Sequence, residues 1–230
     1  MQSSLSQAIP KVISFDCYGT LVQWREVLCA HIAQVLVGRQ LPHLDPVDIL
    51  DTFSKHSRRL EIERPHRLYK TILRQGFAAA FSAHGVTASE DDIEHVAESI
   101  KLMGPHPDTV EALTRLKRRF RLAIFTNSDD DLIAHNVRLL GVPFDHVITA
   151  EQARAYKPDR RLFEHGWRAM RVDKSETVHV AMGMELDMQA CHAIGVRGVW
   201  INRLGTQGIA AWKPYEELPD LTPLPSMLGV

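Results

Sequence analysis

The stretch VISFDCYGTLV, Val12 to Val22, decides the fold. Its first part, Val12–Phe15, is a short and mostly apolar run bounded by turn residues, which predicts a buried strand. The run ends on a carboxylate, Asp16, and the chain then turns at Tyr18-Gly19-Thr20. Ligands of open parallel sheets bind at the carboxyl ends of the strands. An acid that directly follows a buried strand is therefore a candidate functional group.

Four further apolar runs predict strands at Leu122–Phe125, His146–Thr149, Val178–Met182 and Gly198–Ile201. Helical patterns lie before or between them, at Asp108–Arg118, Asp129–Leu140, Arg160–Met170 and Asp187–Ile194. The alternation of strand and helix predicts an α/β fold, with a parallel sheet covered by helices on both faces. The tail Pro214–Val230, rich in proline and leucine, is expected to wrap the surface.

The alternation stops between about Gln23 and Met103. Helical patterns there cover Trp24–Leu36, Pro46–Glu63, Pro65–Ala83 and Ser89–Met103. An insertion of about eighty residues is too long for a crossover between neighbouring strands. We therefore predict a core domain of residues 1–22 and 104–230 and a helical cap domain of residues 23–103. Aromatic side chains of the insertion either line a pocket or pack the cap: Trp24, Phe53, Tyr69 and Phe77.

Composition excludes several classes of protein. The 230 residues are 45% hydrophobic, enough for a sizeable core, and the net charge of -1 favours neither nucleic acid nor an anionic membrane as a partner. No apolar run reaches the length of a membrane span, and MQSSLSQAIPK lacks the basic and apolar regions of a signal peptide. The three cysteines have no metal-binding spacing. We expect a cytoplasmic protein.

Polar clusters follow the predicted strands. They are Asp16 with its turn, Thr126-Asn127-Ser128, Tyr156-Lys157-Pro158-Asp159, and Glu185 with Asp187. Each cluster alone is what an ordinary turn or helix cap contains. Together they predict one polar site at the carboxyl edge of the sheet.

The order of these clusters resembles the haloacid dehalogenase superfamily, and FDCYGTLV, YKPDRRLFE and WINRLG resemble its L-2-haloacid dehalogenase (type II) branch. The resemblance covers nearly the whole chain. It implies a Rossmann-like core with a helical cap inserted after the first strand. It also implies a hydrolase of the 2-haloacid dehalogenase class (EC 3.8.1), which cleaves C–X bonds of small 2-substituted carboxylic acids through an aspartyl ester.

The resemblance also implies roles for individual residues. Asp16 would be the nucleophile, and Lys157 would keep it ionised. Asp187 with Lys157 would position the hydrolytic water, and Thr126 with Asn127 would hold the substrate carboxylate. The catalytic set is thus Asp16, Thr126, Lys157 and Asp187, and the substrate-binding set is Tyr18, Thr20, His56, Arg59, Asn127 and Glu185.

Two positions argue against phosphate chemistry. Phosphatases of the superfamily usually carry an acid two residues after the nucleophile, to protonate the leaving alkoxide. Tyr18 stands there, with an ordinary pKa near ~10, and a halide needs no proton. Phosphatases also usually carry a magnesium-binding Asp where this chain has Met182, and a thioether is a poor magnesium ligand. We expect a metal-independent site without a cofactor.

The match has departures. His56 stands where the branch typically has a halide-assisting arginine, with Arg58 and Arg59 nearby, and Met182 and Met184 replace a serine and an asparagine that help position water. These departures concern the substrate more than the reaction type.

Other functions stay open. The same chemistry could open a C–N bond in a strained cyclic amino acid, whose ammonium group Glu185 could face. A phosphatase-like hydrolase would need magnesium and an acid that the sequence does not supply. A non-catalytic binder of small carboxylates would need neither Asp16 nor Lys157. The sequence also leaves open whether the cap surface forms a homodimer.

Overall fold

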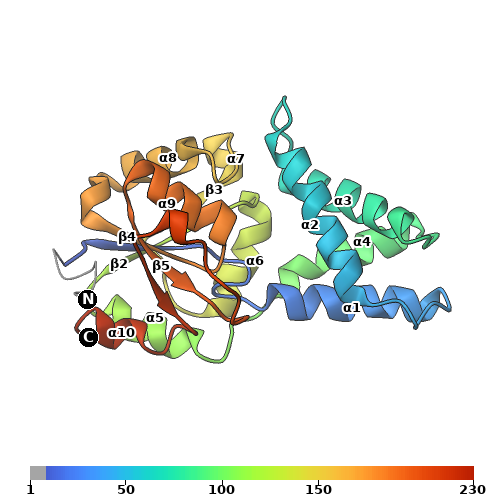
Figure 1. Ribbon diagram of the computed structural model, residues 1–230, viewed down its shortest axis with the longest axis horizontal. Helices are drawn as coiled ribbons and strands as arrows, with labels where there is room; N and C mark the ends of the chain where they lie inside the picture. The colour runs from blue at the N-terminus through green and yellow to red at the C-terminus, as the bar shows by residue number, and fades with distance from the viewer. Residues whose placement is uncertain (1–8) are drawn as a thin grey trace.

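A computed structural model describes residues 9–230, and a six-stranded sheet forms its centre (Figure 1). Every neighbouring pair of strands is parallel, in the order β3-β2-β1-β4-β5-β6. The strands are β1 Val12–Phe15, β2 Arg121–Thr126, β3 His146–Thr149, β4 Thr177–Ala181, β5 Arg197–Ile201 and β6 Tyr215–Leu218. The predicted α/β fold with a parallel sheet is confirmed. Most of the segment used to predict the lack of a signal peptide, residues 1–8, lies outside the described residues.

Strand β1 lies at the point where the order of the sheet reverses. Its Phe15 is paired with Ile124 of β2 on one side and with Val180 of β4 on the other. The chain builds the sheet outward from β1 through β2 and β3, and then returns to β4 at the opposite side. Such a reversal opens a crevice at the carboxyl ends of the strands. Asp16 directly follows β1 and therefore lies at this crevice.

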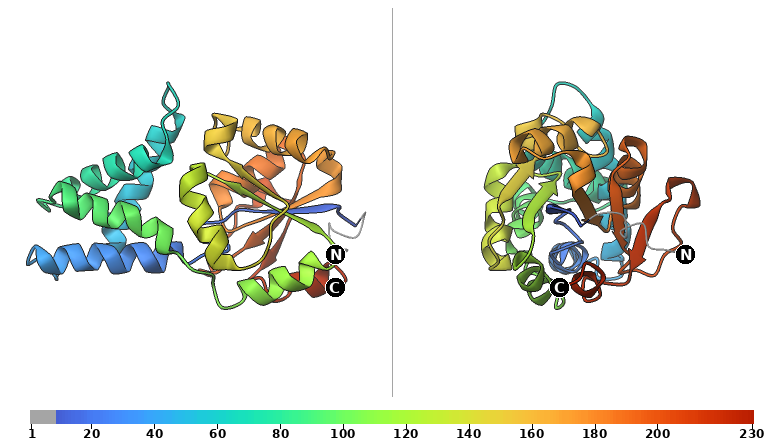
Figure 2. Two further views of the ribbon diagram at one scale, coloured as in Figure 1. Left: turned by 180° about the vertical axis from the view of Figure 1, so that it is seen from behind. Right: turned by 90° about the vertical axis from the view of Figure 1, so that its left-hand side faces the viewer.

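Helices cover both faces of the sheet, as expected. Figures 1 and 2 show α8 and α9 above the sheet and α5 and α10 below it. The helices that follow the cap segment are α5 Thr109–Lys117, α6 Asp130–Leu140, α7 Ala150–Ala153, α8 Arg160–Met170, α9 Gln189–Ile194 and α10 Leu224–Met227.

The expectation that the tail only wraps the surface is wrong. Its Tyr215–Leu218 segment forms β6 and pairs in parallel with β5, and α10 packs near α5. The sequence of β6, Tyr-Glu-Glu-Leu, carries two charges. An edge strand tolerates such charges because one of its sides stays open, so apolar patterning does not reveal it.

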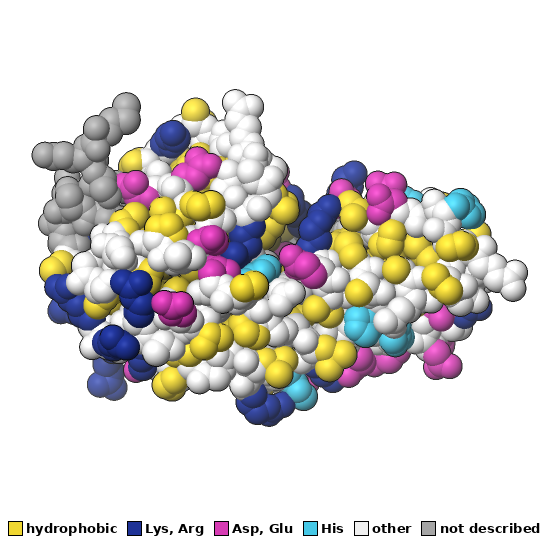
Figure 3. Space-filling view, turned by 90° about the horizontal axis from the view of Figure 1, so that it is seen from below, with side chains coloured by type: hydrophobic (Ala, Val, Ile, Leu, Met, Phe, Trp, Pro, Cys, Tyr) yellow, Lys and Arg dark blue, Asp and Glu magenta, His cyan; other side chains and the backbone are white. Residues whose placement is uncertain are grey.

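Four helices form a separate group at one end of the molecule (Figures 1 and 2). They are α1 Trp24–Gly38, α2 Pro46–Ile62, α3 Tyr69–Ala83 and α4 Glu90–Glu98, followed by the 3-10 helix η2 Ser99–Leu102. Stacked rings of Phe53 and Phe77, with centroids 4.0 Å apart, join α2 to α3. Figure 3 shows acidic and basic side chains interspersed over one face of the molecule. The division into core and cap domains at the stated boundaries stays a prediction.

Helix α3 begins at Tyr69, four residues later than Pro65 where the pattern placed it. Its first backbone N–H groups, those of Tyr69 and Lys70, donate to the two carboxylate oxygens of Asp129 at 2.7 and 2.9 Å. Asp129 stands just before α6, and it satisfies donors that a helix start otherwise leaves unpaired. A residue distant in sequence therefore marks where this helix starts.

Within residues 9–230, none of the helices combines the length and the apolar content that crossing a bilayer requires.

Gly166 of α8 lies in close contact with the Phe125 ring of β2. A Cβ atom at this position would lie 2.2 Å from the ring of Phe125, which is fully buried. We expect Gly166→Ala to lower the free energy of unfolding by about 1–3 kcal/mol, because the ring has to move within a packed core. Urea denaturation measures this change. Gly38→Ala is the control, since nothing lies within 4 Å of its added Cβ. Equal stability of the two variants would contradict the packing described here.

Candidate active site

Three charged side chains meet at the carboxyl edge of the sheet. The ammonium Nζ of Lys157 donates to Oδ1 of Asp16 at 2.8 Å and to Oδ1 of Asp187 at 2.6 Å. The three residues come from the turn after β1, the loop before α8, and the single π-helical turn η4 Met184–Met188. All three are buried, with Lys157 2% exposed. The structure thus brings together three of the four predicted catalytic residues.

Burial and mutual charge set the protonation of this group. Burial raises the pKa of Asp16, and the charge of Asp187 adds to this effect, while Lys157 opposes it. Burial would also raise the pKa of Asp187, but Lys157 and His179 hold it below its usual value. The two carboxylates hold the pKa of Lys157 above its usual value despite burial. Lys157 therefore stays charged, and Asp16 takes up a proton before Asp187 as the pH falls.

Thr20 orients the carboxylate of Asp16 through a hydrogen bond. Its hydroxyl donates to Oδ2 of Asp16 at 2.7 Å and accepts from the backbone N–H of Met182 at 2.8 Å. Gly19 makes this turn feasible with a φ of 81°, and a Cβ there would lie 2.7 Å from the sulfur of Met182. Both oxygens of Asp16 thus have fixed donors. Thr20 itself is fully buried and does not line the cavity described below.

His179, a residue to which the motifs gave no role, supports Asp187. Its Nε2 lies 2.9 Å from Oδ1 of Asp187, and its Nδ1 lies 2.9 Å from the hydroxyl of Ser14. The imidazole is fully buried in β4 and packs edge-on against Phe163. A histidine within an otherwise apolar strand needs polar partners, and that was the available signal.

Asn127 links the loop after β2 to Lys157. Its Oδ1 accepts from the backbone N–H of Lys157 at 2.6 Å, and its Nδ2 donates to the carbonyl of Lys157 at 3.1 Å. The neighbouring Thr126 is fully buried, and its hydroxyl has no hydrogen-bond partner among residues 9–230. A buried hydroxyl without a partner is a donor held in reserve, although Thr126 does not line the cavity beside Asp16.

A cavity of about 280 Å³ opens beside Asp16, Lys157 and Asp187. Its aromatic wall comes from Trp24, Phe53 and Tyr69, so these side chains line a pocket, while Phe77 packs behind Phe53. The remaining lining residues are Tyr18, Ser54, Ser57, Arg58, Glu61, Asn127, Met182, Gly183, Met184 and Leu186.

One face of α2 forms the polar wall of this cavity. Ser54, Ser57, Arg58 and Glu61 lie on that face at helical spacing. Glu61 is buried, and its carboxylate accepts from the Ser57 hydroxyl at 3.0 Å and from Nδ2 of Asn127 at 3.2 Å. Burial raises the pKa of Glu61 to about 7. Glu61 belongs to none of the motifs that predicted the site, although the polar spacing along α2 was the available signal for it.

Of the other predicted binding residues, Tyr18 lines the cavity, whereas Glu185 and Arg59 line an adjoining hollow. The ring of Tyr18 lines the cavity, while its hydroxyl donates to Oδ1 of Asn136 at 3.0 Å, and burial raises its pKa well above the usual value. Glu185 forms an ion pair with Arg58 across the junction of cap and core. His56 and Arg59 do not line the cavity. Arg59 is exposed and lies 3.9 Å from Glu63 along α2.

The hydrolase profile described as haloacid dehalogenase-like hydrolase matches residues 10–195. The chain belongs to the haloacid dehalogenase-like hydrolase family. This finding confirms the family that was inferred from the motifs at Asp16, Thr126-Asn127, Lys157-Pro158 and Asp187.

Curated relatives of this haloacid dehalogenase-like chain include several 2-haloacid dehalogenases. (S)-2-haloacid dehalogenase H-109 of Pseudomonas putida is 28% identical over 126 residues, 53% of this chain and 55% of the relative. Haloacetate dehalogenase H-2 of Moraxella sp. (strain B) is 31% identical over 136 residues, 58% of each chain. The chain therefore spans little more than half the length of these two relatives in the matched regions.

Solved structures share the fold over almost the whole chain. L-2-haloacid dehalogenase from Xanthobacter autotrophicus with chloropropionic acid covalently bound has a TM-score of 0.83 and 18% identity, covering 95% of this chain and 98% of that chain. The defluorinating L-2-haloacid dehalogenase Rha0230 has a TM-score of 0.83 and 22% identity, covering 100% and 99%. These neighbours confirm the Rossmann-like core with a helical cap.

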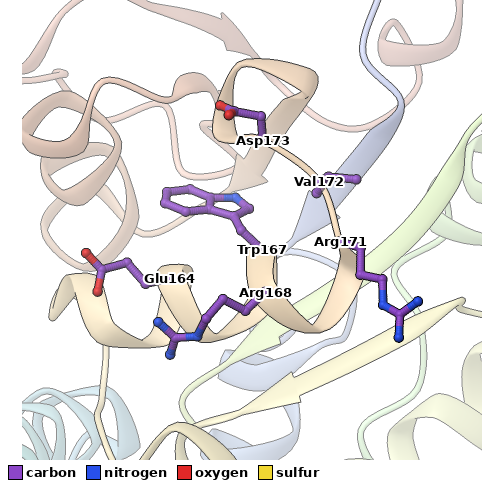
Figure 4. Close-up of a pocket in the computed structure, with 6 residues that line it drawn as sticks. All are labelled: Glu164, Trp167, Arg168, Arg171, Val172 and Asp173. Atoms are coloured by element: carbon purple, nitrogen blue, oxygen red, sulfur yellow. The ribbon is translucent and has the colours of Figure 1, made fainter.

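A second hollow of about 480 Å³ lies at the carboxyl end of α8. Figure 4 shows its lining residues, Glu164, Trp167, Arg168, Arg171, Val172 and Asp173. Arg171 and Asp173 point away from one another, and the charged groups do not converge on a common point (Figure 4). This hollow shares no lining residue with the cavity at Asp16, and we assign it no chemistry.

Lys157→Met tests the central ion group of this hydrolase-family site. The variant leaves Asp16 and Asp187 buried without their cation, so we expect the free energy of unfolding at neutral pH to fall by about 3–5 kcal/mol. The loss should shrink under acidic conditions, where Asp16 becomes protonated. Denaturant titrations at both pH values measure this. Lys117→Met, which removes a partly exposed pair with Asp145, should cost less than about 1 kcal/mol. A Lys157→Met variant as stable as this control would contradict the assignment.

Glu61→Gln tests the raised pKa of Glu61. The folded protein binds the Glu61 proton up to about pH 7, whereas the unfolded chain releases it near 4.5, so wild-type stability falls as the pH rises through this window. The variant lacks this effect. Its stability relative to wild type should therefore rise by about 3 kcal/mol between pH 4.5 and 8, measured by denaturant titration.

Asp131→Asn provides a control of opposite sign. A hydrogen bond from Lys70 holds the pKa of Asp131 below its usual value, so its ionised form stabilises the fold above that value and the contribution is lost as the pH falls. The stability of this variant relative to wild type should fall with rising pH only below the ordinary aspartate pKa of 3.8 and should stay level between about pH 4.5 and 8. Parallel trends for the two variants would refute the environment assigned to Glu61.

Proposed function

We propose that the protein hydrolyses a C–X bond in small 2-substituted carboxylic acids, as a 2-haloacid dehalogenase does. The observation that carries this proposal is the carboxylate of Asp16, which lies at a small cavity and accepts hydrogen bonds from Lys157 and Thr20. A buried carboxylate with few water molecules around it is a nucleophile for carbon.

The reaction has two steps. An oxygen of Asp16 attacks C2 of the substrate, the O–C2 bond forms, and X⁻ leaves with the electron pair of the C2–X bond, with inversion at C2. Water then attacks Cγ of the aspartyl ester and breaks the bond from Cγ to the oxygen carried by C2. The products are a 2-hydroxy acid and the free Asp16 carboxylate, with release of one proton. Asp187 and Lys157 position this water.

Three kinds of observation support this substrate class. The cavity of about 280 Å³ suits a small molecule. We assign the substrate carboxylate to Asn127, which lines the cavity, and to the neighbouring Thr126, whose buried hydroxyl has no hydrogen-bond partner among residues 9–230 but does not itself line the cavity. Two relatives are by name haloacid or haloacetate dehalogenases, and one structural neighbour is described with chloropropionic acid covalently bound.

The leaving group departs without an acid in this proposal. The hydroxyl of Tyr18 is engaged with Asn136 and its pKa is raised, so it is a poor proton donor. Arg58 lines the cavity where His56 and Arg59 do not, and we assign to the departing halide the guanidinium N–H groups that its pair with Glu185 leaves over.

The residues present do not suit magnesium, which takes oxygen ligands. The sulfur of Met182 packs against Gly19, and the ammonium of Lys157 already bridges Asp16 and Asp187. We therefore propose a reaction that needs no metal or cofactor. Three further expectations stay predictions: a cytoplasmic location, the lack of nucleic-acid and membrane partners, and a possible homodimer.

Chloride release from L- and D-2-chloropropionate, measured separately in EDTA, tests this function. We expect release from one isomer, and Asp16→Asn should lower the rate by at least about a thousandfold, because the amide cannot form the ester. Asp131→Asn, an exposed carboxylate outside the cavity, is the matched control and should retain the rate. Release that EDTA abolishes, or that survives in Asp16→Asn, would sink the proposal.

A further inference from the structure

The cavity beside Asp16 holds an excess of acidic groups. Asp16, Glu61 and Asp187 all line it, and Lys157 is bonded to both aspartates. The other cation of the lining, Arg58, is paired with Glu185. Glu61 forms no ion pair with a lysine, arginine or histidine within residues 9–230. A substrate that carried only a carboxylate would add a further negative charge to this lining.

Neighbouring groups hold Glu61 in the geometry of a hydrogen-bond acceptor. The Asn127 amide has one orientation, since its Oδ1 accepts the backbone N–H of Lys157, so its Nδ2 is the atom that faces Glu61. The hydroxyl of Ser57 donates to the other oxygen of Glu61. With both oxygens accepting, the arrangement suits the ionised carboxylate, the form that predominates above about pH 7, yet neither donor carries a charge to balance it.

Aromatic rings complete the surroundings. Trp24, Phe53 and Tyr69 line the same cavity as Glu61. Positively charged nitrogen is stabilised both by the faces of aromatic rings and by carboxylates, and the gain increases where water is excluded. A cationic group is thus the chemistry that this cavity lacks and that its walls favour.

We propose that the cavity takes a 2-substituted carboxylic acid that also bears a positively charged nitrogen, and that Glu61 binds this ammonium group. The inference rests on the proposed function for the position of the reacting carbon next to Asp16. It assigns the ammonium to Glu61 rather than to Glu185, whose carboxylate is paired with Arg58 at the cap–core junction.

Two substrates of nearly equal shape test this specificity. 3-Amino-2-chloropropionate differs from 2-chlorobutyrate in having an ammonium group where the latter has a methyl group, and both lose chloride from C2. We expect kcat/KM for the enantiomer that reacts to be at least about tenfold higher for the amino compound. A ratio near one, or one that favours 2-chlorobutyrate, would overturn the inference while leaving the proposed function intact.

Glu61→Gln assigns the effect to its residue. This variant should bring the ratio of the two kcat/KM values close to one, whereas Asp51→Asn, which removes an exposed carboxylate on the same helix, should keep the wild-type ratio. A ratio that stays high in Glu61→Gln would refute the role of Glu61. The wild-type comparison decides the specificity even if Glu61→Gln fails to fold.

Binding without turnover separates this inference from the proposed function. Calorimetry with 3-aminopropionate and butyrate, which carry no leaving group, should show at least about tenfold tighter binding of the amino compound to wild type. If no chloride is released but this preference is present, the proposed function fails and the ammonium site stands. Equal binding of the two compounds, or binding of neither, overturns the ammonium site.

Discussion

The ammonium group of Lys157 is the contact on which the rest of the site depends. It lies between two buried carboxylates, Asp16 and Asp187, that could not both stay ionised in this position without it. The three residues come from three separate segments of the chain, after β1, before α8 and in η4. The sheet must bring these segments together before the group can form. The fold and the charge balance are therefore requirements for one another.

Hydrogen bonds from neighbouring polar groups fix the positions of the two carboxylates. Thr20 ties Asp16 to the backbone of Met182, and His179 with Ser14 ties Asp187 to the middle of the sheet. Helix α2 lines the opposite side of the cavity, and there Glu61 is hydrogen-bonded by Ser57 and Asn127 without a countercharge. The cluster of Asp16, Lys157 and Asp187 is the basis of the proposed chemistry, and Glu61 on α2 is the basis of the proposed choice of substrate.

Local pattern was sufficient for some features and insufficient for others. The first five strands follow from short apolar runs, and Asp16, Lys157 and Asp187 could be placed at one edge because parallel strands end together. Strand β6 was not predicted, because its two charged residues hide the apolar pattern of a strand and are tolerated only at the edge of a sheet. Glu61 and His179 escaped because their importance depends on Asn127 and Asp187, partners that only the folded chain places beside them. Arg59 was the predicted binding residue, but Arg58 is the one that lines the cavity. Neighbouring residues on a helix point in different directions, so the sequence alone did not decide between them.

The carboxylate of Asp129 has a consequence for how such a protein could change over generations. It stands at the start of α6 yet accepts no capping hydrogen bond from that helix, and it accepts hydrogen bonds from the first two N–H groups of α3 instead. A foreign cap grafted onto this core would leave a fully buried carboxylate facing nothing, unless its own helix began at the same point. The start of α3 in the cap and the carboxylate of Asp129 in the core are thus matched to one another, so the two parts cannot be exchanged independently.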